Sequence, residues 1–147
     1  MNKVSALSAC LTIGIGMSTL FSASVAAETL VEQRVENFKK SSDAIKAVFK
    51  THLPAGDFAT IRAFGEEMAQ WGKDIPSYFP PEATSEGAKP AIWENWSDFQ
   101  NKAADFSLKA SAVVTASAGG DAAAIGGAVK ALGGACKACH DSYRNKK

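Results

Sequence analysis

Residues 91–121, AIWENWSDFQNKAADFSLKASAVVTASAGGD, contain the pattern that decides the fold. Apolar side chains recur there at steps of four and three residues, which is the spacing of one face of an α-helix. Gly119 and Gly120 end this pattern, and Asp121 is a residue type that caps a following helix. The stretch therefore predicts a long amphipathic helix that begins near Pro90. Its apolar face consists of Ile92, Trp96, Phe99, Ala103, Phe106, Ala110 and Val113.

Three other stretches show the same helical spacing. The first covers residues 28–52, which contain neither Pro nor Gly, and the sequence LPAG at 53–56 breaks it. The second covers residues 57–72, with an aspartate as its cap and a glycine as its end. The last follows Asp121, and its apolar face carries Ile125, Val129, Leu132, Cys136, Cys139 and Tyr143.

Four amphipathic helices with no intervening strand pattern predict an all-α fold, an antiparallel four-helix bundle. A proline-rich segment, residues 73–90, is expected to form a long irregular crossover between the second and third helices. Gly133 and three other glycines lie inside the fourth helix, where each costs about 1 kcal/mol relative to alanine. Two explanations for this cost stay open. The glycines could leave room for a flat, bulky partner two turns before His140, or they could allow close contact between helices.

The composition excludes several classes of protein. The chain has 147 residues, of which 46% are hydrophobic and 21% charged, and its net charge is +1. Such values exclude a disordered, collagen-like or polytopic membrane protein. Near-neutral charge gives no basis for nucleic-acid binding, which needs a basic patch. No constellation for catalytic turnover is present, so we expect a protein that is not an enzyme.

The first 27 residues have the composition of a secretory signal peptide. Lys3 is their one charged residue, an apolar stretch shorter than a membrane span follows, and small residues ending in Val25-Ala26-Ala27 precede Glu28. We expect cleavage after Ala27, which leaves residues 28–147 as the mature domain, with no membrane span, in the periplasm. An uncleaved anchor is the alternative.

The sequence Cys136-Lys137-Ala138-Cys139-His140 is C-x-x-C-H, the attachment signature of c-type haem. Thiols at positions i and i+3 of a helix project to one side, where they can form two thioether bonds with the vinyl groups of one haem. His140 is four residues after Cys136, so its imidazole shares that side and can bind the iron. One covalent haem c per chain is therefore expected, with Cys136 and Cys139 as attachment residues and His140 as metal ligand.

Three other interpretations of the two cysteines compete with haem attachment. A structural zinc site normally needs four ligands, and only the distant His52 could join the three residues of the motif. A thioredoxin-like redox pair needs a βαβ context, which the helical pattern does not provide. A disulfide between Cys136 and Cys139 in a haem-free binding bundle is the third interpretation.

Few residues of the mature chain could serve as a second protein ligand of the iron. Residues 141–147 follow the motif and include neither Met nor His, and the mature chain offers only Met68 and His52 upstream. We expect Met68 to pack in the core and His52 to lie at a helix end. Five-coordinate iron with an open, apolar opposite side is therefore expected. A low-spin, six-coordinate electron carrier that uses Met68 or His52 is the alternative.

Two motifs give the mature chain a family resemblance. The tail from Cys136 to Arg144 resembles the C-x-x-C-H-x-x-Y-R signature of cytochrome c′, the high-spin class II c-type cytochrome. Lys89-Pro90-Ala91-Ile92-Trp93 is similar to the basic-Pro-x-Ile-Trp sequence that opens the third helix of that family. The resemblance covers the whole mature chain and implies a four-helix bundle with haem c on its last helix.

The resemblance also implies roles for residues outside the motif. Arg34 matches an arginine that approaches a haem propionate, and Phe38 matches the residue that covers the open side of the iron. Arg144 matches an arginine beside the face of the haem that His140 binds. Phe79 is expected to be a second aromatic residue on the open side, and Glu86 lies next to the expected slot of a further propionate partner.

The resemblance implies electron transfer and the binding of diatomic gases. An open side without a hydrogen-bond donor favours NO and CO over the more polar bound form of O₂. Members of the family often form homodimers through their first two helices, so a homodimer is one expected assembly. The redox partner is not identified by any feature of the sequence.

Overall fold

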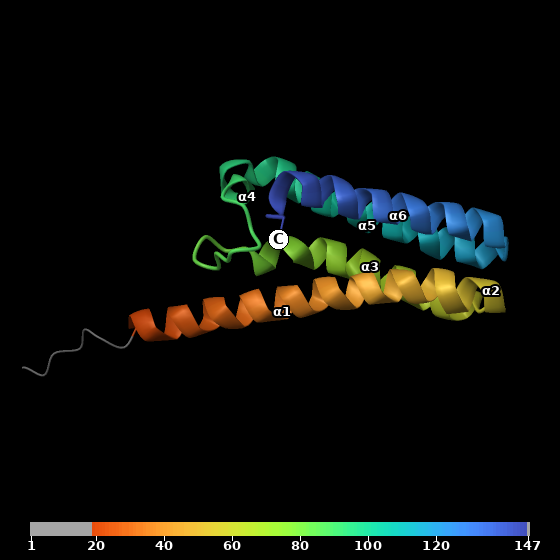
Figure 1. Ribbon diagram of the computed structural model, residues 1–147, viewed down its shortest axis with the longest axis horizontal. Helices are drawn as coiled ribbons and strands as arrows, with labels where there is room; N and C mark the ends of the chain where they lie inside the picture. Colours follow the sequence, from red (N-terminus) through yellow and green to blue (C-terminus); the bar gives the residue numbers. More distant parts are fainter. Residues whose placement is uncertain (1–18, 147) are drawn as a thin grey trace, which may run out of the picture.

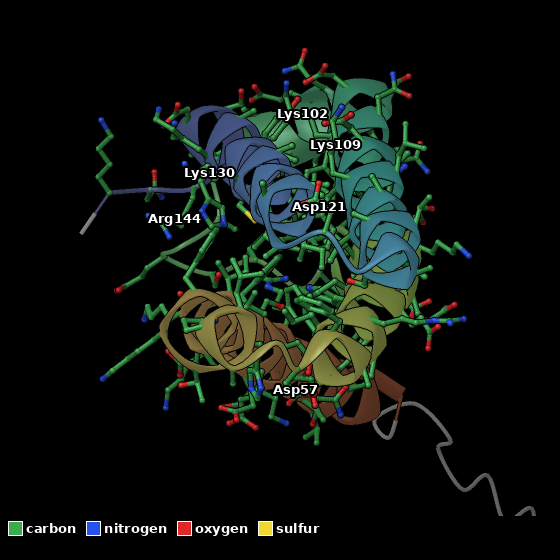
Figure 2. All side chains as sticks on the ribbon, turned by 90° about the vertical axis from the view of Figure 1, so that its right-hand side faces the viewer. Asp57, Lys102, Lys109, Asp121, Lys130 and Arg144 are labelled. Carbon is green, nitrogen blue, oxygen red and sulfur yellow. The ribbon has the colours of Figure 1, made fainter. Side chains whose placement is uncertain are left out.

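The computed structural model describes residues 19–146, with side chains from Val25 onward, and shows four long helices in an antiparallel bundle (Figure 1). The long helices are α1 (Thr19–Ala47), α3 (Phe58–Asp74), α5 (Trp96–Gly119) and α6 (Ala122–Tyr143). Viewed along the bundle, α5 and α6 form one layer and α1 and α3 the other, with side chains between them (Figure 2). The predicted all-α four-helix bundle is confirmed.

The first helix is longer than its sequence pattern predicts. After α1, residues Val48–His52 form the π-turn η1, in which the Leu53 N–H bonds the Val48 carbonyl, and α2 (Leu53–Ala55) follows directly. Pro54 lies in the first turn of α2, where the lack of an N–H does little harm. The chain leaves helical geometry at Gly56, whose φ of +68° suits glycine.

Both aspartate caps form as predicted, at the end of the bundle that faces the viewer in Figure 2. Asp57 Oδ1 accepts from the Thr60 N–H at 3.2 Å, and Asp121 Oδ1 accepts from the Ala123 N–H at 2.9 Å. These bonds satisfy N–H groups that an isolated helix start leaves unpaired. Gly120 adopts a φ of +71° between α5 and α6, as expected for a glycine that ends a helix.

The predicted end of the second helix at Gly72 is wrong, because α3 continues to Asp74 with Gly72 buried inside it. A Cβ atom on Gly72 would lie 2.8 Å from backbone atoms of Ser107 in α5. The glycine therefore permits close approach of α3 and α5, which are in contact along their lengths. Ser107 adds a hydrogen bond from its Oγ to the Ala69 carbonyl at 2.7 Å.

Replacing Gly72 with alanine should therefore lower the free energy of unfolding by about 1–3 kcal/mol, the usual cost of overpacking a core. Urea unfolding followed by circular dichroism measures the change. Gly127→Ala is the matched control, since a Cβ there meets nothing within 4 Å and should add stability through helix propensity. Equal behaviour of the two variants would contradict the close-contact explanation.

The third helix is interrupted where the sequence predicts continuity. A short α4 (Ala91–Glu94) ends at Asn95, whose φ of −123° and ψ of 48° are not helical, and α5 begins at Trp96. The Asn95 amide Nδ2 donates to the Ala91 carbonyl, which is the competition with backbone bonding typical of asparagine. The apolar face predicted for α5 is otherwise confirmed.

The crossover between α3 and α4 is fastened at both ends. It starts with the 3₁₀ helix η2 (Ile75–Tyr78), and its far end pairs with the C-terminus of α6. An isolated bridge joins Ala88 to Arg144, and the Lys89 N–H donates to the Tyr143 carbonyl at 3.0 Å. The crossover therefore closes the end of the bundle that carries the C-x-x-C-H motif.

The core runs along the whole bundle, and α1 joins it differently from the other helices. Close backbone approach is extensive between α3 and α5 and between α5 and α6, whereas α1 makes its main close contacts with η1 and η2. Side chains therefore bridge α1 to the other helices. The core residues include Ile61, Phe64, Met68, Ile92, Phe99, Phe106, Val113, Ile125, Val129 and Leu132.

Candidate functional site

The last two turns of α6 carry the three residues of the predicted haem site. Cys136 and Cys139 are free thiols that are partly buried and packed against the core. His140 is also partly buried. Because the three residues lie at i, i+3 and i+4 on one continuous helix, they share one side of α6.

Both thiols are held in the neutral form. Burial raises the pKa of the Cys136 thiol, and burial raises the pKa of Cys139 to about 11, with Lys102 opposing part of that rise. Reactive redox cysteines have the opposite property, a lowered pKa in a positive environment. The environment therefore does not support the redox-pair interpretation of the motif.

The zinc interpretation also lacks support. Among residues 19–146, no group of three or more His, Cys, Asp or Glu side chains is arranged to hold a metal ion. His52 lies near α2, at the end of the bundle opposite the C-terminus (Figure 1), and its Nδ1 is 3.0 Å from Asp57 Oδ2. It therefore does not join Cys136 and Cys139 in a ligand set.

The imidazole of His140 is kept in the form that binds a metal. Burial lowers the pKa of His140, and the positive charge of Arg144 lowers it further, while Asp141 acts in the opposite direction. A neutral imidazole is the state that coordinates iron. Arg144 itself is exposed at the end of α6 (Figure 2), so its effect on His140 is electrostatic.

Phe38 of α1 faces His140 of α6 across the bundle. Their ring centroids are 6.1 Å apart, and the ring planes are inclined at 76°. The sequence placed these residues on two helices more than 100 positions apart, and the fold brings them together. Phe38 offers no atom that could bind iron, so the side chain that faces His140 is purely apolar.

Trp71 is a neighbour of Phe38 that the sequence analysis did not identify. Its indole meets the Phe38 ring edge-on, with centroids 5.3 Å apart, and meets the Tyr78 ring at 5.1 Å. The helical spacing of α3 predicts only that Trp71 is buried, which it is. No local signal shows which residue of α1 it contacts, because that depends on how two helices pack.

Arg34 is buried, with 2% of its surface exposed, one turn before Phe38. Its guanidinium donates to the carbonyls of Tyr78 at 2.9 Å and Ala83 at 2.7 Å, and to Ser85 Oγ at 2.8 Å. The same group lies 4.2 Å from the centroid of the Phe79 ring. Arg34 therefore fastens α1 to the crossover.

No carboxylate pairs with Arg34 among the described side chains, although buried charges are normally paired. Burial lowers the pKa of Arg34 accordingly. Phe79, which is expected on the open side of the iron, packs between Arg34 and Phe99, whose ring centroid is 4.9 Å away. Glu86 is exposed, and its carbonyl accepts from Asn145 Nδ2.

Substituting Arg34 with methionine should lower the free energy of unfolding by about 2–4 kcal/mol, because three charge-assisted hydrogen bonds to the crossover are lost. Urea titration measures this change. Arg62→Met is the control, since Arg62 makes an exposed pair with Glu66 and its removal should have little effect. Similar losses in both variants would show that Arg34 does not fasten the crossover.

Tyr143 lies one turn beyond Cys139 and is buried. Its hydroxyl donates to Asp98 Oδ2 at 2.5 Å, and burial, followed by this bond, raises the pKa of Tyr143 to about 12. The folded chain therefore favours the neutral phenol. This contribution to stability is complete below pH 10 and is lost as the pH rises towards 12.

A Tyr143→Phe variant should therefore lose less stability between pH 10 and pH 12 than the unaltered chain. Thermal unfolding midpoints measured across this range test the prediction. Tyr78→Phe is the matched control, because it removes the hydroxyl of the other tyrosine in the chain. If the unaltered chain and both variants lose the same stability between pH 10 and pH 12, the raised pKa of Tyr143 does not contribute to the stability of the fold.

A model of the family described as Cytochrome C' matches residues 29–144, which includes both the bundle and the motif. The chain belongs to the cytochrome c′ family. Cytochrome c-556 from Agrobacterium tumefaciens (strain II Chrys) is 38% identical over 121 residues, covering 80% of this chain and 98% of the relative. The family proteins are electron carriers with covalent haem c, and Cys136 and Cys139 fit the attachment motif.

Solved structures of the cytochrome c′ family share the fold. Cytochrome c′ from Thermochromatium tepidum superposes with a TM-score of 0.71 at 26% identity, covering 82% of this chain and 97% of the other. A nitric oxide complex of a mutant cytochrome c prime from Alcaligenes xylosoxidans also superposes with a TM-score of 0.71 at 26% identity, covering 82% of this chain and 97% of the other. This chain is therefore a haem c protein of the cytochrome c′ family.

The residues of this cytochrome c′ family member fit a haem in three respects. The donor set of two neutral thiols and one neutral imidazole suits thioether bonds and an axial nitrogen ligand. Buried Arg34 lacks an anionic partner among the described side chains, and a haem propionate carries the negative charge that would pair with it. A Cβ atom on Gly133, two turns before His140, would meet nothing within 4 Å. Close helix contact thus does not explain Gly133, and the open space there is compatible with room for a flat partner.

The two alternative iron ligands lie in other surroundings. Met68 is 3% exposed and belongs to the core between α3 and the other helices. His52 is at the opposite end of the bundle and pairs with Asp57. In contrast, Phe38 is the aromatic residue that contacts the His140 ring. These positions weigh against the six-coordinate alternative.

Proposed function

We propose that this chain is an exported haem c protein that holds iron through His140 alone, binds NO and CO on the opposite side, and exchanges electrons. The observation that carries the proposal is the 6.1 Å approach of Phe38, which has no ligating atom, to the ring of His140. Haem c supplies an iron that changes between ferric and ferrous states and accepts a diatomic ligand. We propose no enzymatic role for the chain.

The roles of the remaining residues follow from their surroundings. Cys136 and Cys139 attach the cofactor to α6, next to the imidazole that binds the metal. Arg34 places a positive charge beside the same region while fastening the crossover over the end of the bundle. Arg144 lies one turn beyond His140, and its positive charge adds to burial in lowering the pKa of the imidazole. Together these groups fix the side of the bundle on which a ligand enters.

Phe38 determines which ligands are accepted on that side. Its ring fills the space in front of His140 and excludes water and large ligands. The ring donates no hydrogen bond, so a polar bound form such as that of O₂ gains no stabilisation from it. NO and CO depend less on such a bond. The nitric oxide complex of the mutant cytochrome c prime from Alcaligenes xylosoxidans supports the proposal that this chain binds NO.

Export to the periplasm is part of the proposal. Residues 1–18 of the proposed leader lie outside the described residues, and α1 runs from Thr19 across the proposed cut after Ala27. No helix in the described part of the chain is sufficiently long and apolar to span a bilayer. Expression in a cell that attaches haem c after export, followed by mass measurement, should give a chain that starts at Glu28 with one haem.

Gas titrations of the reduced protein test the selectivity. We expect saturable CO and NO binding, with O₂ binding undetectable at ambient pressure. Stable O₂ binding would contradict the proposal that the side of the iron facing Phe38 has no hydrogen-bond donor. Sedimentation in the presence and absence of CO tests the separate expectation of a homodimer through the first two helices.

A further inference from the structure

Trp71 carries a buried polar atom that the proposed function does not use. The side chain is 7% exposed, and its indole Nε1 has no hydrogen-bond partner. Within the described side chains, it is the one buried nitrogen or oxygen in this condition. Trp93 provides a contrast, because its Nε1 donates to the Phe79 carbonyl at 3.0 Å.

An unpaired N–H in a protein interior is unfavourable, because the group has lost its bond to water without a replacement. Such a group persists where a ligand, ion or water supplies the missing acceptor. The Trp71 indole is therefore an observation that itself points to a bound partner.

The position of Trp71 indicates where that partner lies. Its indole packs edge-on against Phe38, and Phe38 packs edge-on against His140, so the three rings form a continuous chain from α3 through α1 to α6. Tyr78 borders the indole on its other side, and the Tyr78 carbonyl already accepts from Arg34. Trp71 thus borders the proposed haem region. Its indole ring contacts the rings of Phe38 and Tyr78, and its Nε1 meets no oxygen acceptor among the described residues.

We propose that the Trp71 indole N–H donates a hydrogen bond to an oxygen atom that enters the bundle with the haem. This inference rests on the proposed function, since it requires haem beside Phe38. Two sources supply the same acceptor chemistry, namely a propionate carboxylate of the haem and a small ligand on the side of the iron that Phe38 faces. Trp71 is then a residue that sets the properties of the cofactor, rather than a plain core residue.

Ultraviolet resonance Raman spectroscopy tests the bond, because indole bands respond to hydrogen bonding at Nε1. The chain contains three tryptophans, so a Trp93→Phe/Trp96→Phe double variant leaves Trp71 as the single indole. The reduced double variant should show a hydrogen-bonded indole in the presence of haem. An indole without a hydrogen bond in every state, with or without CO, would overturn the proposal in favour of weak contact with aromatic rings.

Trp71→Phe removes the donor and distinguishes the two sources. For a propionate acceptor, the variant should shift the midpoint potential while the C–O stretching frequency of the CO complex stays constant. For a ligand acceptor, the indole band should change on CO binding, and Trp71→Phe should shift the C–O stretching frequency. The second result would also require the selectivity argument based on Phe38 to be revised.

Trp93→Phe is the matched control, because it removes an indole whose bond goes to the Phe79 carbonyl. It should alter neither the potential nor the C–O frequency. If Trp71→Phe fails to fold, the indole band of the double variant still decides the question. A colourless unaltered protein would refute the proposed function, whereas normal haem with an unbonded Trp71 would refute this inference alone.

Discussion

Exchanging both Cys136 and Cys139 for serine will leave the chain without covalently attached haem. The two thiols are the only cysteines of the proposed mature chain, so no other side chain can form the thioether bonds. Acid–acetone extraction should remove all residual haem from the double variant and none from the unaltered protein. Single variants should retain one thioether and show a shifted absorption band after denaturation in pyridine.

The matched control for this experiment is Lys137→Ala, which lies between the two cysteines. Lys137 is exposed and pairs with Asp141, so its loss should leave attachment intact. Circular dichroism should show whether the serine variant keeps its helices, because the apolar core of α3, α5 and α6 does not depend on the thiols. Haem that stays covalently bound in the double variant would refute the assignment of the motif.

Replacing Phe38 with methionine will convert the proposed open iron site into a six-coordinate, low-spin site. Phe38 is the residue of α1 that meets the ring of His140, and a methionine sulfur at that place is a haem ligand. The absorption and electron paramagnetic resonance spectra should change from high-spin to low-spin form. If displacing the sulfur costs about 1.4 kcal/mol, apparent CO affinity should fall about tenfold.

Val35→Met is the matched control for Phe38→Met. Val35 is on the same helix, three residues earlier, but is 59% exposed, so a sulfur there should leave the spectrum and CO binding unchanged. Phe38→Ala adds a second comparison, since removing the ring should speed CO association without creating a ligand. A high-spin Phe38→Met protein with unaltered CO affinity would show that Phe38 does not cover the iron.

Local chemistry made most of the helices predictable. The capping bonds of Asp57 and Asp121 and the helix end at Gly119 and Gly120 depend on neighbouring residues in the sequence, and all three formed as expected. Gly72 was misassigned as a helix end because its role depends on Ser107, far along the chain. The interruption at Asn95 likewise reflects a side-chain bond within one short turn that periodicity does not detect.

The site was predictable only where its residues are close in sequence. Cys136, Cys139 and His140 form a compact motif whose spacing predicts a chemistry, and the family match supports it. The approach of Phe38 to His140 was accessible through resemblance, because it joins the first and last helices. Trp71 had no such signal, since its partner is set by the packing of α3 against α1.

The most direct test of the central claim is the spin state of the unaltered protein, read from its visible absorption spectrum when oxidised, when reduced and with CO. The account predicts high-spin iron in both ligand-free states and conversion to a low-spin CO complex. A sharp low-spin spectrum before any CO is added, with no change on its addition, would contradict His140 as the one protein ligand.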